Sequence, residues 1–136
     1  MSGSDKLFYH LEPLIIEQID QVKPRDLGHL AYAYSVRSVG NPELYAAIDK
    51  RLERLIDENG KTSFDYPTLF DLNYYMIFRE SKNEKIWKAI IESTVAQDDV
   101  LPITYYKPFK FSRFYLQHHF PQWDITAYVD KFWYAE

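Results

Sequence analysis

Adjacent histidines are the first side chains to consider for metal chemistry in this sequence. His118 and His119 are neighbours near the end of an aromatic stretch, and imidazoles are common metal ligands. Consecutive residues of a helix point about 100° apart, however, so a neighbouring pair seldom shares one ion. Further ligands would have to come from His10, His29 or distant carboxylates. We interpret the pair as surface or interface histidines and predict no metal site.

Two acidic pairs, Asp57-Glu58 and Asp98-Asp99, are the candidates for acid–base catalysis. General acid–base catalysis needs carboxylates that face one another across a cleft and have shifted pKa values. Adjacent residues in a turn seldom meet this requirement. Both pairs are therefore interpreted as solvated turns.

Nucleophilic and phosphate-binding motifs are missing from the sequence. Ser35 and Ser38 lack a Gly-x-Ser-x-Gly frame, and the 4 glycines form neither a Walker A loop nor a Gly-x-Gly-x-x-Gly loop. The chain has no cysteine, which excludes disulfides, zinc–thiolate sites, iron–sulfur clusters and thiol catalysis. The sequence predicts that the chain is not an enzyme, with no catalytic residue and no cofactor.

The strongest candidate for a contact site is the basic and aromatic stretch 105–120. It contains Lys107, Lys110 and Arg113 and no acidic residue. On a helix these cations would form one stripe. The rings between them could contact a protein partner, stack on RNA bases or lie at an anionic lipid surface. The alternative is structural, with the cations at the solvated edge of a core that contains the rings of Phe109, Phe111, Phe114 and Tyr115.

The last residues of the chain are also rich in aromatic side chains. Trp133 and Tyr134 lie in the sequence VDKFWYAE, which is too aromatic for a free end. We expect these two rings to pack against the preceding helices or to anchor the chain on a partner.

The elements that must position these residues are helices. A leading helix is predicted over residues 6–22, where apolar residues recur at helical spacing, and Pro13 is expected to kink or restart it. A second helix begins near Pro24, because proline is favoured in a first turn. Gly40 is expected to end that helix in a left-handed conformation, and Asn41-Pro42-Glu43 predicts the start of the next.

An apolar pattern recurs at intervals of 42 residues. All six recurring positions stay apolar or aromatic in three copies. A fixed period of this length is typical of helical solenoids, in which each hairpin buries the apolar side of its neighbour. The sets are Leu27, Leu69 and Phe111; Leu30, Leu72 and Phe114; Tyr32, Tyr74 and Leu116; Leu44, Ile86 and Tyr128; Tyr45, Trp87 and Val129; and Ile48, Ile90 and Phe132.

The sequence therefore predicts an all-α fold in one domain that spans residues 1–136. Its apolar content of 46% is enough for a substantial core. We expect a short α-solenoid made of the leading helix and about three antiparallel helical hairpins, at about residues 24–58, 66–97 and 103–134. The alternative is an irregular bundle of seven helices in which the spacing is coincidental.

Residues 23–56 resemble a known family of helical repeats. Those repeats read Pro-x-Asp-Leu-x-x-Leu-x-x-Ala-Tyr, followed by a short turn and a second amphipathic helix. The pattern is met here by Pro24, Asp26, Leu27, Leu30, Ala33 and Tyr34. The segment is similar to the repeats beside RAP domains in FAST-kinase-like mitochondrial proteins, and to heptatricopeptide and octotricopeptide arrays.

The resemblance implies an α-solenoid with a mitochondrial location. Many members of that family bind organellar RNA, but this chain shows no nuclease-like RAP segment. The expected function is a non-catalytic scaffold, a small accessory subunit of a respiratory-chain complex, the ATP synthase or the ribosome. Its partners would be other protein subunits. The alternative is an RNA-binding helical-repeat module that acts with partners.

Charge and hydropathy narrow these alternatives. The net charge of -4 argues weakly against strong binding to RNA. No apolar run approaches the roughly 18 residues of a membrane span, so the chain is not expected to cross a membrane. The first residues do not read as a clear transit peptide or secretory signal.

Overall fold

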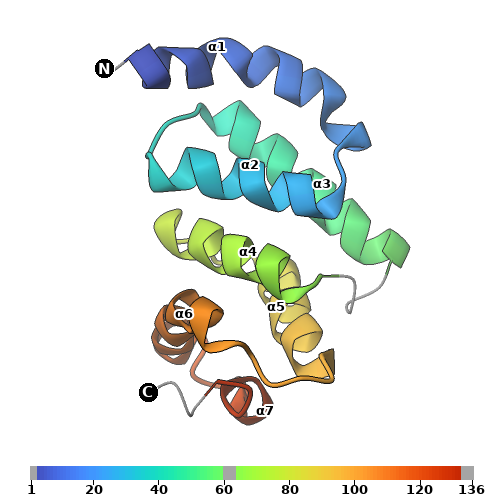
Figure 1. Cartoon of the computed structure of the whole chain (residues 1–136), viewed down its shortest axis with the longest axis vertical. Coiled ribbons are helices and arrows are strands. Elements are labelled where there is room, and N and C mark those ends of the chain that lie inside the picture. The colour runs from blue at the N-terminus through green and yellow to red at the C-terminus, as the bar shows by residue number, and fades with distance from the viewer. Residues whose placement is uncertain (1–2, 60–63, 133–136) are drawn as a thin grey trace.

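The computed structural model describes residues 3–59 and 64–132 and is all-helical in this part of the chain (Figure 1). It contains no strand there, which confirms the predicted fold class. Two short 3₁₀ helices cover Ile19–Gln21 and Ile103–Tyr105. The α-helices are α1 (Gly3–Gln18), α2 (Pro24–Val36), α3 (Pro42–Asn59), α4 (Tyr66–Phe78), α5 (Glu84–Ala96), α6 (Tyr106–His119) and α7 (Thr126–Val129).

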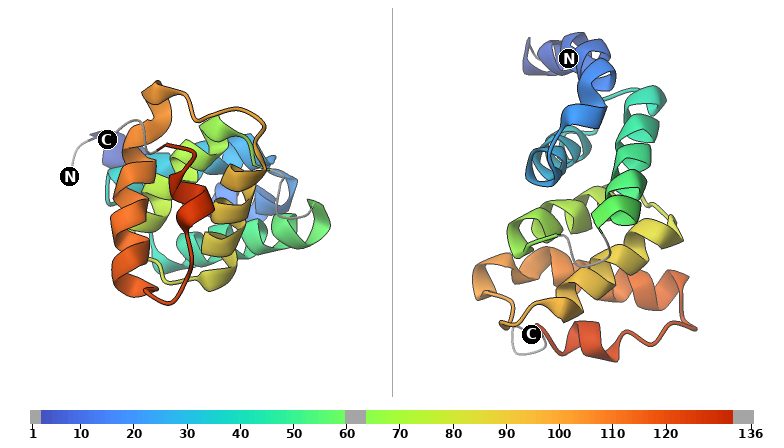
Figure 2. Two further views of the ribbon diagram at one scale, coloured as in Figure 1. Left: turned by 90° about the horizontal axis from the view of Figure 1, so that it is seen from below. Right: turned by 90° about the vertical axis from the view of Figure 1, so that its right-hand side faces the viewer.

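The helices stack in two layers along the long axis of the molecule (Figures 1 and 2). In one layer α2 packs on α4 and α4 packs on α6. In the other, α1 packs on α3, α3 on α5 and α5 on α7. Consecutive hairpins thus pack against one another, and this arrangement is compatible with a short solenoid. The helix α1 lies at one end of the stack and α7 at the other.

Local signals set most helix boundaries. The helix α3 begins at Pro42, as the Asn-Pro-Glu sequence predicts, and Gly40 has a φ of 104°, in the left-handed region. The helix α2 ends at Val36, before Gly40, and the turn also holds Ser38 at a φ of 55°. Pro13 lies inside α1, which continues through it without a restart.

The second helix of each pair carries the most regular core. Two of the predicted sets are fully buried in all three copies, namely Leu44, Ile86 and Tyr128, and Ile48, Ile90 and Phe132. Helices α3, α5 and α7 begin at Pro42, Glu84 and Thr126, so these sets fall at matching places. In the third predicted set of this layer only Trp87 is fully buried, whereas Tyr45 and Val129 are half-buried.

The first helix of the third pair departs from the predicted pattern. Phe111 and Phe114 are 45% and 54% exposed, although the pattern places them with the buried Leu69 and Leu72. Because α4 begins at Tyr66 and α6 at Tyr106, the interval here is 40 residues, not 42. A uniform 42-residue period is thus not confirmed. The third pair also ends in a four-residue α7 instead of a long second helix.

Candidate protein-binding surface

The shifted start of α6 turns two phenylalanines to the outside. The buried side of the helix consists of Pro108, Phe109, Ser112 and Leu116. On the opposite side, Lys107, Phe111, Phe114 and His118 are exposed and follow one another at intervals of three and four residues. Residues at this spacing share one face of a helix. The structure thus separates the rings of the basic stretch, since Phe109 is core and Phe111 and Phe114 are surface.

A run of aromatic rings continues along α4. Phe70, Tyr74 and Phe78 are four residues apart and line one side of this helix. The rings of Phe70 and Tyr74 are 5.1 Å apart between centroids, and those of Tyr74 and Phe78 are 5.6 Å apart and stacked. Tyr32 of α2 joins them, with its ring 5.5 Å from that of Tyr74. The far end of the run is 49% exposed at Phe78.

The rings of α6 fall on a side of that helix that corresponds to the aromatic side of α4. Helices α4 and α6 run in the same direction, because Tyr66 contacts Phe109 near their starts and Asn73 contacts Ser112 further along. With starts 40 residues apart, Phe114 occupies on α6 the place that Tyr74 has on α4. We use "aromatic face" for the six residues Tyr32, Phe70, Tyr74, Phe78, Phe111 and Phe114.

The three predicted cations are divided between two sides of α6. Lys107 is exposed beside Phe111, whereas Lys110 and Arg113 are half-buried. The Arg113 guanidinium carbon lies 5.6 Å from the centre of the Phe114 ring. Arg113 also lines a hollow that holds Asp130 of the segment after α7. Only part of the predicted basic stripe therefore borders the aromatic face.

The other predicted site residues do not come together. Within residues 3–59 and 64–132, no group of three or more His, Asp or Glu side chains is placed to hold a metal ion. His118 and His119 contact each other edge to face, and Asp57 forms an ion pair with Lys85 at 2.7 Å. Trp133 and Tyr134 lie outside the described residues. No helix of the described part is long and apolar enough to cross a membrane.

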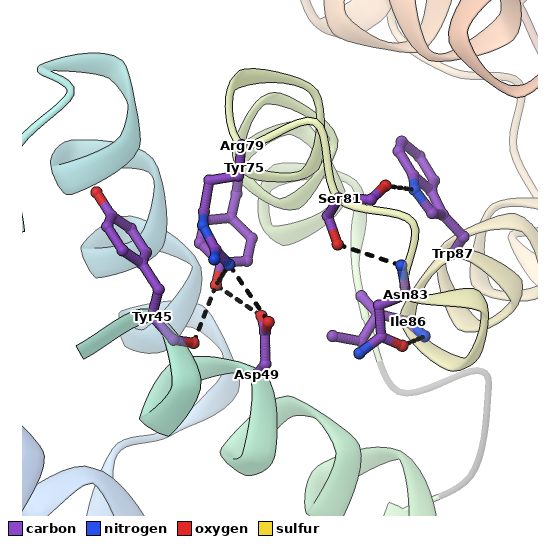
Figure 3. A network of polar contacts seen from close by, with 8 residues as sticks. All are labelled: Tyr45, Asp49, Tyr75, Arg79, Ser81, Asn83, Ile86 and Trp87. Atoms are coloured by element: carbon purple, nitrogen blue, oxygen red, sulfur yellow. Dashed lines mark hydrogen bonds and ion pairs between the residues drawn. The ribbon is translucent and has the colours of Figure 1, made fainter. Parts of the chain in front are cut away.

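The buried Tyr75 joins α3 to α4 (Figure 3). It belongs to a cluster of ionisable side chains whose role is structural. The Tyr75 hydroxyl donates a hydrogen bond to Asp49 Oδ1 at 2.6 Å, and Arg79 donates to the Tyr75 oxygen at 2.8 Å. Burial, together with the Asp49 carboxylate, raises the pKa of the Tyr75 hydroxyl. A tyrosine with a raised pKa stays protonated at neutral pH and cannot act as a base there. The cluster holds two hairpins together.

A second polar contact joins α2 to α4 through a buried carboxylate. Asp71 Oδ2 lies 2.9 Å from Nδ1 of His29, and its side chain is 7% exposed. Burial raises the pKa of the Asp71 carboxyl above its ordinary value of 3.8, and the nearby His29 opposes this rise only in part. The close approach of α2 and α4 explains the burial, because Gly28 leaves room for Asp71 and Thr68 against its backbone.

Stability is expected to respond to pH through Asp71. Because the folded state holds this proton more tightly than the unfolded state, its contribution to the free energy of unfolding falls as pH rises from 3.8 through the raised pKa. The stability of the wild type relative to Asp71→Asn should therefore decrease across that window. Urea unfolding at a series of acidic pH values measures this difference, and a difference that grows with pH would show that the pKa is lowered instead.

No protein-family model, curated protein or solved structure matches the chain. Function must therefore be inferred from the surfaces of the chain itself. The aromatic face contains the exposed phenylalanines Phe78, Phe111 and Phe114. Its α4 half was not anticipated from the sequence, although the spacing of Phe70, Tyr74 and Phe78 at four residues was a usable signal.

Proposed function

We propose that this chain is a non-catalytic helical-repeat scaffold that binds other proteins through the aromatic face. The observation that carries this proposal is the exposure of three phenylalanines on one layer of the stack, at 45% for Phe111, 49% for Phe78 and 54% for Phe114. Soluble chains seldom leave such rings grouped on one surface unless a partner covers them. Aromatic side chains are enriched at the centres of protein interfaces.

The three exposed rings would supply a substantial part of the free energy of binding. Covering about 100 Å² on each of the three rings would contribute roughly 2.5 kcal/mol per ring at about 25 cal/mol per Å². The rings lie on helices that are already packed, so little backbone ordering opposes binding. Lys107 and His118 lie at the edges of the aromatic face. Their contacts with acidic side chains would orient the bound partner.

We further propose that the chain is a small accessory subunit of a large mitochondrial assembly, such as a respiratory-chain complex, the ATP synthase or the ribosome. The resemblance of residues 23–56 to mitochondrial helical repeats supports the location. A stack of helices that offers a rigid aromatic face supports the structural role.

RNA binding is the alternative function that a specific observation favours. Phe111 and Phe114 could stack on bases beside Lys107. Against this, Lys110 and Arg113 are half-buried, and Arg113 shares its hollow with Asp130. A gel-shift assay with single-stranded RNA at two salt concentrations separates the two functions. Tight binding that weakens steeply with salt would favour RNA, because phosphate contacts release counterions.

The double variant Phe111→Asp/Phe114→Asp tests the proposed function. Because both rings are exposed, we expect its free energy of unfolding to stay within about 0.5 kcal/mol of the wild type. We expect co-purification of partner subunits from gently solubilised mitochondria to fall at least about tenfold, since two central aromatic contacts are lost. Quantitative mass spectrometry of the tagged chain measures this.

Val100→Asp is the matched control for that experiment. Val100 is 59% exposed but lies in the connector before α6 and outside the aromatic face. The control should keep the partners that the wild type binds. Equal recovery of partners with the double variant and the wild type would reject the aromatic face as the binding surface.

A further inference from the structure

A second uncovered surface lies at the end of the stack where α1 and α2 are located. A groove of about 720 Å³ runs between α1 and α2, and most of its lining is apolar. Leu7 and Leu11 of α1 border it and are 56% and 37% exposed. Leu30 and Ala33 of α2 form part of the opposite wall, and Asp26 lies at its rim. The groove shares Tyr34 with the core but none of the six residues of the aromatic face.

One wall of the groove is formed by α2, and its residues correspond in position to buried residues of α4. Helices α2 and α4 each have 13 residues, and α4 begins 42 residues after α2. On α4, the four residues at the matching positions are only 0% to 5% exposed, because they are covered by α2 and α3. The four matching pairs, α2 first, are Asp26 and Thr68, His29 and Asp71, Leu30 and Leu72, and Ala33 and Tyr75. The groove therefore exposes on α2 the positions that a neighbouring helix buries on α4.

The other wall of the groove is formed by α1, and its exposure also follows from the way the helices stack. The helix α1 packs on α3 in the way that α3 packs on α5, so α1 belongs to the second layer of the stack. In the described residues, no helix precedes α2 in the first layer, beside α1. The space bounded by α1 and α2 thus lies where a further helix would continue this layer.

We infer that this groove binds an amphipathic α-helix of a partner protein. The repeated stacking of helices indicates that the occupant is a helix. Each groove residue of α2 has a matching residue on α4, and on α4 that residue is covered by a neighbouring helix. A second copy joined head to tail is disfavoured, because the hollow described at the opposite end does not match this apolar lining. The hollow there carries the charged side chains of Arg113, Asp124 and Asp130.

The packing of α2 on α4 defines the chemistry of the partner helix. It should extend over about 13 residues, as α2 and α4 do, with apolar residues at intervals of three and four. A small residue is required where it crosses α2. At the matching crossing, a Cβ on Gly28 would lie 3.3 Å from Thr68 Cγ2 and 3.5 Å from Asp71 Cβ. A Lys or Arg at its edge would complement the exposed Asp26.

This inference rests on the proposed role as a protein-binding scaffold, but it concerns a different surface. The two can fail separately, because the aromatic face and the groove share no residue. Substitutions in one should leave binding at the other unchanged.

A phage-displayed library of 16-residue peptides, selected on the full chain, provides the probe. We expect the enriched peptides to show the apolar spacing of an amphipathic helix with one small residue on the apolar side. Synthetic copies should bind the wild type and lose at least about tenfold in affinity on Leu7→Glu/Leu11→Glu, because each charge must be desolvated against the bound helix. Fluorescence polarisation measures the affinities, and circular dichroism reports helix formation on binding.

Two variants serve as controls for the groove. Val100→Glu/Ile103→Glu changes residues that are 59% and 61% exposed away from the groove and should bind the peptides as the wild type does. Phe111→Asp/Phe114→Asp should also bind them normally. Peptides without a helical pattern, or peptides that bind Leu7→Glu/Leu11→Glu equally well, would overturn the inference.

Two other occupants of the groove can be tested with the same variant. If Leu7→Glu/Leu11→Glu abolishes self-association of the chain, the groove binds a second copy. If it abolishes binding to anionic vesicles, the groove binds lipid. Either result would overturn the inference.

Discussion

Replacing Trp87 by alanine is expected to lower the free energy of unfolding by about 4 kcal/mol, because a fully buried large ring is removed from the core. Trp87 has no exposed surface and stacks on Tyr115 of α6 at 5.5 Å between ring centroids. Its indole N–H donates a hydrogen bond to the Ser81 carbonyl at 2.8 Å (Figure 3). The same carbonyl accepts a hydrogen bond from the Tyr115 hydroxyl at 2.9 Å. One side chain thus joins α5, α6 and the turn between α4 and α5.

Urea unfolding of the wild type, Trp87→Ala and Trp87→Phe measures this contribution. The phenylalanine variant keeps part of the buried ring but loses the hydrogen bond, so we expect a smaller loss of about 2 kcal/mol. A loss below about 1 kcal/mol in the alanine variant would mean that α5 and α6 are not packed against each other through this ring.

Replacing Asn73 by leucine is expected to cost about 3 kcal/mol of stability, although the side-chain size is nearly conserved. Asn73 is fully buried at the junction of α4, α6 and α7. Its Oδ1 atom accepts hydrogen bonds from Ser112 at 2.5 Å and from Tyr128 at 3.0 Å, and its Nδ2 donates to the Leu69 carbonyl at 2.7 Å. Leucine would remove the acceptor that the buried Ser112 and Tyr128 hydroxyl groups share.

The triple variant Asn73→Leu/Ser112→Ala/Tyr128→Phe distinguishes this explanation from a packing defect. Removing both hydroxyl groups together with their acceptor leaves no unsatisfied donor, so the triple variant should recover at least about half of the lost stability. Equal or greater loss in the triple variant would show that side-chain volume, not hydrogen bonding, makes Asn73 necessary. The free energies come from the same urea titrations.

Features that depend on local chemistry could be predicted from the sequence. The all-α class and the start of α3 follow from helical periodicity and from the Asn-Pro-Glu sequence, which act within a few residues. The burial of Ile48, Ile90 and Phe132 follows from the regular spacing of the second helices. The first two signals lie in residues that are close together in the chain, and the third lies in a spacing that recurs along it.

Features that depend on contacts between distant segments could not be predicted. The 40-residue interval between α4 and α6 is set by the packing of Phe109, Ser112 and Leu116, and no local signal favours it over 42. That shift decides whether Phe111 and Phe114 are core or surface, and hence where the candidate site lies. Nor does a sequence show that Asn73 becomes an acceptor for residues 39 and 55 positions away.

The size of the native particle that contains this chain tests the central claim most directly. After gentle solubilisation of mitochondria from cells that express the tagged chain, a native gel separates the free chain from large assemblies. We predict that the wild type migrates with a large assembly and that Phe111→Asp/Phe114→Asp migrates as the free chain. Migration of the wild type as a free chain, or its recovery from the cytosol alone, would contradict the proposed role as an accessory subunit.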